Sequence, residues 1–305
     1  MQNFITLSNG QQMPSLGLGT WRSLTGTGKT AVKYAIEKVG YRHIDCASVY
    51  KNEKEIGEAF NEVFSSDKIK RSEVFITSKL WCTDHHSDNV EKACRQTLAD
   101  LKLEYLDLYL MHWGIAFEHG GDLEPIGSDG VIKTAAVSTQ ETWQAMEKLV
   151  EKGLVKAIGV ANFTTAMLID LLGYARIKPA VNQIEIHPYN SQPELVSFCQ
   201  KNNIAVTAYS PLGSAGDLDN KPLSDEVVVE IAGTHAKSPA QILIKWSMQR
   251  GLIVIPKSIK ESRMDENFNV FDFELTDEEM NRINKLNKNH RFINPIEWWG
   301  VPYFN

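Results

Sequence analysis

The chain alternates eight times between a short apolar run and a longer amphipathic stretch, and few folds accommodate such a pattern. Most of the runs are continuous rather than alternating in polarity, as expected for parallel strands buried on both faces. They lie at 15–19, 43–46, 74–78, 106–111, 157–160, 181–184, 205–208 and 252–255. The amphipathic stretches predict helices at 29–39, 53–64, 88–101, 140–151, 165–172, 193–201, 224–235 and 240–250. Predicted N-caps are Thr27, Ser191, Ser224 and Ser238.

Eight such units predict a closed (β/α)8 barrel, a TIM barrel, rather than an open doubly wound sheet. An open sheet that binds a dinucleotide would carry G-x-G-x-x-G after its first strand, and Gly17 to Arg22 does not match this pattern. A short hairpin around Asn9-Gly10 precedes the barrel. A long connection at 114–138 and a polar, aromatic tail at 287–305 fall outside the repeat. Because no Pro-, Gly- or Ser-rich linker interrupts the alternation, residues 1–305 are predicted to form one domain.

Composition excludes several classes of partner. The net charge of −6 and a pI near 5.8 argue against nucleic-acid binding, which usually requires a basic surface. No apolar stretch approaches the length of a membrane span. The four cysteines show neither a CxxC pair nor metal-ligand spacing. We therefore expect a reduced, cytoplasmic protein.

A polar side chain stands at or near the end of most predicted strands. Since active sites of barrels lie where the strands end, these side chains predict a polar site at one mouth. They are Asp45, Lys79, His112, Asn162, Gln183, Glu185, Tyr209, Ser210, Lys257 and Ser258, and Tyr50 follows Asp45 by five residues.

These residue types indicate proton transfer. An ammonium beside a tyrosine favours the phenolate and so lowers the tyrosine pKa, while a carboxylate keeps the lysine charged. Such a group can donate a proton to a developing alkoxide. No Ser-His-Asp arrangement is evident, so a hydride from a cofactor is the natural complement. Two alternatives are a metal at Asp84-His85-His86 and a P-loop at Gly26–Thr30, although the P-loop pattern lacks a glycine at Ser23.

Three blocks of sequence resemble the signatures of the aldo-keto reductases. They are Gly40–Ala47 followed by Tyr50, Glu53, Ile56 and Gly57, then Lys156–Phe163, then Ile255–Ser258 followed by Arg263, Glu266 and Asn267. Shorter matches include Gly19–Trp21, Ser78–Trp81, Met111–Trp113 and Tyr209–Gly213, so that the resemblance covers nearly the whole chain. Segments 178–185 and 294–300 look most like aldose reductases of the xylose type, and the 114–138 connection looks like that of aldose-6-phosphate reductases.

The resemblance implies a role for each residue of a catalytic tetrad. Tyr50 is then the general acid, Lys79 lowers its pKa, Asp45 pairs with Lys79, and His112 orients the substrate carbonyl. The implied cofactor is NADPH in preference to NADH, and the implied substrate is a small carbonyl compound. The predicted cofactor contacts are Thr20, Trp21, Asn162, Gln183, Tyr209, Ser210, Leu212, Ser214, Lys257, Ser258, Arg263, Glu266 and Asn267.

The predicted substrate pocket is aromatic, and its walls are Trp21, Trp81, Trp113, Trp298 and Trp299. We expect an aldose, free or 6-phosphorylated, or another aldehyde, with Lys51, His119 and Arg291 as candidate phosphate partners. Two positions depart from the family pattern. Ala161 replaces a serine or cysteine that would help to hold the nicotinamide carboxamide, and Gly114 replaces a proline.

Overall fold

The computed structural model describes residues 3–23, 26–66, 68–213 and 221–304. Its main sheet has eight parallel strands in sequence order. They are β3 (Leu18–Gly19), β4 (His43–Asp45), β5 (Phe75–Leu80), β6 (Leu108–Met111), β7 (Ile158–Ala161), β8 (Val181–Glu185), β9 (Ala205–Tyr209) and β10 (Ile253–Val254). All eight predicted strands are confirmed, although β3, β4, β6 and β10 are shorter than predicted.

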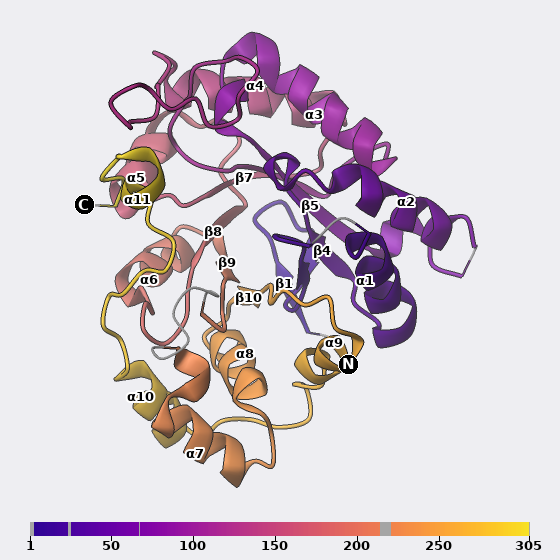
Figure 1. The fold of residues 1–305 in the computed structure, drawn as a ribbon, viewed down its shortest axis with the longest axis vertical. Helices are drawn as coiled ribbons and strands as arrows, with labels where there is room; N and C mark the ends of the chain where they lie inside the picture. The colour runs from indigo at the N-terminus through magenta and orange to yellow at the C-terminus, as the bar shows by residue number, and fades with distance from the viewer. Residues whose placement is uncertain (1–2, 24–25, 67, 214–220, 305) are drawn as a thin grey trace.

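The segments that contain the first and last strands also pair with each other. The amide of Gly17 donates to the Val254 carbonyl at 2.8 Å, and the amide of Val254 donates to the Ser15 carbonyl at 2.8 Å. Parallel bridges join Leu16 to Val254 and Gly19 to Lys257. The sheet thus closes into the predicted (β/α)8 barrel, with strands at the centre and helices outside (Figure 1).

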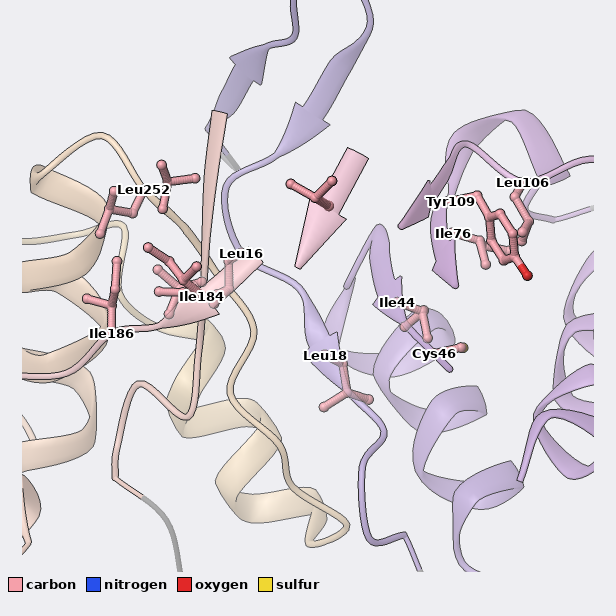
Figure 2. Packing of buried hydrophobic residues seen from close by; sticks show 14 of the residues in the cluster. Leu16, Leu18, Ile44, Cys46, Ile76, Leu106, Tyr109, Ile184, Ile186 and Leu252 are labelled. Carbon is pink, nitrogen blue, oxygen red and sulfur yellow. The ribbon is translucent and has the colours of Figure 1, made fainter. Parts of the chain in front are cut away.

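Alternate residues of several strands belong to two separate apolar cores. On β6, Tyr109 and Met111 belong to the larger core between sheet and helices, whereas Leu108 and Leu110 belong to a smaller core. Figure 2 shows part of the larger core. The smaller core includes Met13 of the antiparallel hairpin β1 (Phe4–Thr6) and β2 (Gln12–Pro14), which confirms the predicted hairpin. An apolar core that joins the barrel strands to this hairpin fills one end of the barrel and leaves the other end for polar side chains.

The eight predicted helices are confirmed to within two residues at each end, apart from the last turn of the first. They are α1 (Gly28–Tyr34), α2 (Glu53–Phe64), α3 (Ser87–Leu101), α4 (Thr139–Glu151), α5 (Thr165–Tyr174), α6 (Pro193–Lys201), α7 (Glu226–Thr234) and α8 (Pro239–Gln249). The chain continues from α1 into a π-helix over Ala35–Val39 that ends at Gly40, where φ is 100°. Glycine is favoured there because left-handed backbone costs it nothing.

Two of the four predicted N-caps are correct. Thr27 and Ser238 precede their helices as predicted, and Ser238 Oγ accepts from the Gln241 amide in a capping box. Ser191 and Ser224 are wrong, because Gln192 precedes α6 and Asp225 caps α7. The Asp225 carboxylate accepts from the Val227 amide at 3.0 Å, and aspartate caps helices as well as serine does.

The start of α1 is not a phosphate site. One oxygen of the Glu55 carboxylate accepts from the Gly26 amide at 3.1 Å and the other accepts from the Lys29 amide at 2.9 Å. The Lys29 ammonium pairs with Glu62 at 2.7 Å. A side chain of the protein therefore occupies the place where a P-loop would bind phosphate, and the P-loop alternative is wrong.

After the barrel come three helices, α9 (Glu261–Phe268), α10 (Asp277–Asn284) and α11 (Ile296–Trp299), which confirm the predicted additional C-terminal structure. The tail with α11 packs against the 114–138 connection. The Ile132 amide donates to the Trp299 carbonyl at 2.9 Å, and the Gly114 amide donates to Tyr303 Oη at 2.8 Å. A proline at position 114 has no amide to donate, so this departure from the family pattern gives the loop a contact with the tail. Among the residues that the structure describes, no helix is both long and apolar enough to cross a bilayer.

Candidate active site

Lys79 is the centre of a buried ionic cluster. It lies on β5, is fully buried, and its Nζ is 2.5 Å from Asp45 Oδ1 at the end of β4. The ammonium also donates to the Cys46 carbonyl at 2.8 Å and to Tyr50 Oη at 3.4 Å. Asp45 Oδ2 accepts from Gln183 Nε2 of β8 at 2.7 Å. Both charges are thus compensated by well-placed partners, as a buried ion pair requires.

Tyr50 ends the 3-10 turn Ser48–Tyr50, which directly follows Ala47. Burial raises the pKa of Tyr50 to about 12; the Lys79 ammonium acts in the opposite direction, and the Asp45 carboxylate adds to the rise. The sequence argument predicted a net lowering of this pKa. That prediction is wrong in net direction for this structure, because the loss of hydration outweighs the effect of Lys79. The phenol therefore keeps its proton at neutral pH.

His112 follows β6 and lies beside the tyrosine. The two rings are 5.9 Å apart between centroids, and the Trp81 ring is 5.2 Å from His112 on another side. Burial, and then the Lys79 charge, hold the pKa of His112 well below its usual value, so the imidazole is neutral. Its buried Nδ1 has no hydrogen-bond partner among the described residues.

These groups lie at one cavity of about 680 Å3. Most of the predicted site residues line it, as the sequence argument expects for side chains at one mouth of a barrel. They are Thr20, Trp21, Asp45, Tyr50, Trp81, His112, Trp113, Asn162, Gln183, Tyr209, Ser210, Leu212, Lys257, Arg263, Trp298 and Trp299. Lys79 lies behind this surface and contacts the lining through Asp45 and Tyr50.

One wall of the cavity is aromatic and joins the 114–138 connection to the tail. Trp299 is 1% exposed and packs on Trp113 at 5.1 Å between ring centroids, whereas Trp298 is 41% exposed. Trp81 Nε1 donates to the Leu123 carbonyl at 2.7 Å, and Trp299 Nε1 donates to Glu124 Oε1 at 3.1 Å. Tryptophans are thus held by their indole N–H groups as well as by packing.

The amides predicted to meet a nicotinamide already hydrogen-bond to their neighbours. Asn162 Nδ2 donates to the His112 carbonyl at 2.9 Å, and Tyr209 Oη donates to Asn162 Oδ1 at 2.7 Å. Asn162 and Ser210 have left-handed backbone, with φ of 63° and 48°. Such strain in residues other than glycine is typical of functional sites. Ala161 is buried in the smaller core, where a serine would need its own hydrogen-bond partner.

The other end of the cavity is cationic. Arg22, Lys257 and Arg263 line it, and none of them forms an ion pair with a described carboxylate. Lys257 Nζ donates to the Arg22 carbonyl at 3.0 Å. Partial burial, and then the Arg22 charge, lower the pKa of Lys257. Cations that crowd one another without a carboxylate suit a phosphate group.

Three predicted adenosine contacts do not line the cavity. Ser258 is buried and its hydroxyl bonds to the backbone of Lys260. Glu266 accepts from Ser238 Oγ at 2.5 Å, and Asn267 is buried on α9. Ser214 lies outside the described residues.

The candidate phosphate partners Lys51, His119 and Arg291 also lie outside the cavity lining. His119 Nδ1 is 2.8 Å from the Thr83 carbonyl. Arg291 donates to Gln192 at 2.8 Å and lies 3.8 Å from the centre of the Phe304 ring.

The three side chains of the alternative metal site diverge. Asp84 pairs with His119 at 3.5 Å, His86 lies 3.9 Å from Glu141, and His85 is buried. Within the described part of the chain, no cluster of three His, Cys, Asp or Glu side chains could hold a metal ion.

Several lining residues are not predicted from the sequence, including Arg22, Glu124, Lys221 and Ile293. Arg22 could have been found from its place next to Trp21. Glu124 lies in an aperiodic connection, where no pattern indicates which side chain faces the cavity.

Comparison with known proteins places this arrangement in a family. Residues 15–288 match the aldo/keto reductase family. Aldo-keto reductase family 1 member A1 of Gallus gallus is 52% identical over 300 residues, which cover 96% of this chain and 91% of the relative. The Homo sapiens protein of the same name is 52% identical over 298 residues, covering 96% and 91%.

Solved structures of aldose reductases have the same fold as this chain. The aldose reductase of Schistosoma japonicum superposes with a TM-score of 0.93 at 46% identity, covering 99% of this chain and 98% of that one. The aldose reductase of Giardia lamblia superposes with a TM-score of 0.91 at 44% identity, covering 95% and 98%. The chain therefore belongs to the aldo/keto reductase family, a family of oxidoreductases.

Proposed function

We propose that the protein uses NADPH to reduce the carbonyl group of an aldehyde or aldose to an alcohol, with Tyr50 as the proton donor and residues 1–305 as one catalytic domain. The observation that carries the proposal is the Tyr50 hydroxyl, which lies at the cavity with its oxygen 3.4 Å from the Lys79 ammonium. The names of the relatives agree with a reductase, since they include aldose reductases.

The proposed cofactor site uses residues along the cavity. Asn162 and Gln183 would hold the nicotinamide carboxamide, the Tyr209 ring would stack on the nicotinamide, and Ser210 and Leu212 would bind the pyrophosphate with Ser214. Thr20 and Trp21 complete this part of the site. Lys257 and Arg263, which form no ion pair with a described carboxylate, suit the 2′-phosphate that distinguishes NADPH from NADH. The contacts of Ser258, Glu266 and Asn267 with adenosine stay predictions. When bound, the reduced cofactor supplies a hydride to the carbonyl carbon.

Tyr50 balances that hydride with a proton. As the carbonyl carbon gains the hydride, the electron pair of the C=O π bond moves to oxygen, which takes the phenolic proton and becomes a hydroxyl group. The charge left on Tyr50 Oη lies beside the Lys79 ammonium, which Asp45 holds in place. Proton donation of this kind is worth about 10²–10⁴-fold in rate.

His112 is proposed to orient the substrate. Because its pKa is held well below the usual value, the ring is neutral and carries one N–H that can donate to the carbonyl oxygen. A neutral donor positions the carbonyl without competing with Tyr50 as the acid.

Two alternatives remain distinct from an aldose reductase. One is a general aldehyde reductase of broad specificity. The other is a nicotinamide-binding regulatory subunit of a membrane channel without turnover of its own. The assembled Asp45–Lys79–Tyr50 cluster favours an enzyme, because binding alone has no use for a proton donor with a buried ammonium behind it.

The direct test is oxidation of NADPH, followed at 340 nm, with D-xylose, glucose 6-phosphate, mannose 6-phosphate and butyraldehyde as substrates. We expect turnover of at least one neutral aldehyde and formation of the corresponding alcohol. Tight NADPH binding without turnover of any of the four would support the regulatory subunit and overturn the proposal.

A further inference from the structure

We propose that the substrate end of the cavity selects against anionic aldehydes, so that the protein takes uncharged ones, and that Glu124 imposes this selection. The inference rests on the proposed function and names the substrate class of the same site. It excludes phosphorylated aldoses as preferred substrates, although the sequence argument kept them among the leading candidates.

Glu124 is held on the cavity wall by its surroundings. Trp299 Nε1 donates to Glu124 Oε1 at 3.1 Å, and Trp81 Nε1 donates to the carbonyl of the preceding residue, Leu123, at 2.7 Å. Two tryptophans that line the cavity thus hold Leu123 through its backbone carbonyl and Glu124 through its side chain. The Trp81 ring in turn packs on His112 at 5.2 Å, which places this wall next to the groups proposed to meet the carbonyl.

The charge of Glu124 is not compensated within the described part of the chain. Glu124 is exposed at the surface, lines the cavity and forms no ion pair with a described Lys, Arg or His. The other carboxylate of the described lining, Asp45, is neutralised by Lys79 at 2.5 Å. An anionic substrate at this wall would therefore meet a negative charge that no cation of the described residues compensates by an ion pair.

The cations of the described lining lie elsewhere. Lys257 bonds to the Arg22 carbonyl, and Arg263 lies on α9. Lys221 precedes Pro222, whose Cδ lies close to Gly213 in the stretch proposed for the pyrophosphate. Lys257, Arg263 and Lys221 thus belong to the part of the lining proposed for the cofactor phosphates, whereas the Arg22 guanidinium lies 4.4 Å from the centre of the Trp21 ring.

The three side chains predicted to bind a sugar phosphate also do not line the described cavity. Arg291 is engaged by Gln192 and Phe304, and neither Lys51 nor His119 lines the cavity. The cavity therefore divides its charge, with phosphate-binding groups at one end and a carboxylate at the other.

The variant Glu124→Gln tests the proposal with NADPH and two aldehydes of similar shape, neutral 4-nitrobenzaldehyde and anionic 4-carboxybenzaldehyde. Glutamine keeps an oxygen that can accept from Trp299 Nε1, so the wall is preserved while the charge is lost. The ratio of kcat/KM, anionic over neutral, is measured in both proteins, which cancels the intrinsic reactivities. We expect the ratio to rise about 3- to 10-fold in the variant, as a single charge near the solvent predicts. The rise should shrink in 0.5 M NaCl, where such charges are screened.

Glu297→Gln is the matched control, because Glu297 is an exposed carboxylate on the same tail that does not line the cavity. We expect its ratio to equal that of the wild type. Turnover of the neutral aldehyde with an unchanged ratio in Glu124→Gln would overturn the charge selection alone. Failure of the wild type to reduce either aldehyde would overturn the proposed function and this inference together.

Discussion

Lys79 shows how single residues of this site depend on one another. The ammonium has no exposed surface, and its hydrogen bonds reach Asp45, the Cys46 carbonyl and Tyr50. Removing one partner of such a buried pair leaves an uncompensated charge and typically costs about 3–5 kcal/mol of stability. Variants of Asp45 and Lys79 therefore confound folding with catalysis, whereas Tyr50 and the cationic residues can be changed more cleanly.

The preference for NADPH is tested at Arg263. We expect Arg263→Ala to raise KM for NADPH about 10-fold or more, because a charge-assisted hydrogen bond to phosphate contributes about 1.5–3 kcal/mol. KM for NADH should change much less, since NADH has no 2′-phosphate. Lys260→Ala is the control, as Lys260 is exposed nearby and does not line the cavity. An equal loss with both cofactors would contradict the assignment.

At the residue scale, much of the site could be predicted because barrel geometry brings strand ends together. Position at or near a strand end is enough to predict that a polar side chain lies at the site, as for Asp45, Lys79, His112, Asn162 and Gln183. The direction of the Tyr50 pKa shift could not be predicted from position, because it depends on how completely the surrounding chain removes water from the phenol. The cavity-facing position of Glu124 depends on a loop without periodicity.

Among the helices, α2 and α3 meet at a glycine of the family signature. A Cβ built on Gly57 would lie 2.1 Å from the Asp100 carbonyl oxygen of α3, a backbone atom that cannot rotate away. The glycine thus permits a close helix–helix approach beside the turn that presents Tyr50. Helix packing therefore explains why a glycine occupies this position of the signature.

Gly57→Ala is expected to lower the free energy of unfolding by at least about 2 kcal/mol, because the two helices must separate. Gly173→Ala is the matched control, since nothing lies within 4 Å of a Cβ at this position of α5. Alanine should stabilise that helix by about 0.5–1 kcal/mol. Urea unfolding of both variants checks the pair, and equal effects would show that the contact at Gly57 is not tight.

Strands and helices could be predicted from sequence because each has a characteristic apolar period. Their ends were less predictable. Serine and aspartate are both common N-caps, so the sequence alone does not show whether Ser224 or Asp225 caps α7. The path of the backbone makes Asp225 the cap. The shortness of β3 and β10 reflects the place where the barrel closes through isolated bridges.

For the whole molecule, buried histidines predict sensitivity to acid. Burial lowers the pKa of His43 to about 4, that of His85 to about 3, and that of His112 well below its usual value. The unfolded chain binds these protons near pH 6.5. From that pH down to about 4 the unfolded state holds more protons, so the native state loses stability as pH falls.

Glu53 acts in the opposite direction, because burial raises the pKa of its carboxyl to about 7 and the native state therefore binds that proton before the unfolded state does. Three histidines less this one carboxyl leave about two excess protons on the unfolded state, so the slope approaches about 2.7 kcal/mol per pH unit. Urea unfolding between pH 7 and pH 5 should show this loss, and His85→Gln should reduce the slope by about one half. His290→Gln, at an exposed site, is the control that should leave the slope unchanged. A slope that is the same in all three proteins would contradict this account.

The layer formed by the 114–138 connection and the tail is the least predictable part of the molecule. Its hydrogen bonds join segments that are far apart in sequence and have no repeating pattern. Examples are the bond from the Gly114 amide to Tyr303 Oη and the bond from the Ile132 amide to the Trp299 carbonyl. The sequence argument predicted that Trp298 and Trp299 contact the pocket, but could not predict that one is buried and the other exposed.

The most direct measurement is single-turnover reduction by Tyr50→Phe, with NADPH binding measured in parallel by quenching of tryptophan fluorescence. Phenylalanine keeps the ring and removes the only atom proposed to give up a proton. We expect NADPH to bind as in the wild type while carbonyl reduction slows by about 10²–10⁴-fold. Reduction at the wild-type rate, with the cofactor bound, would contradict the account.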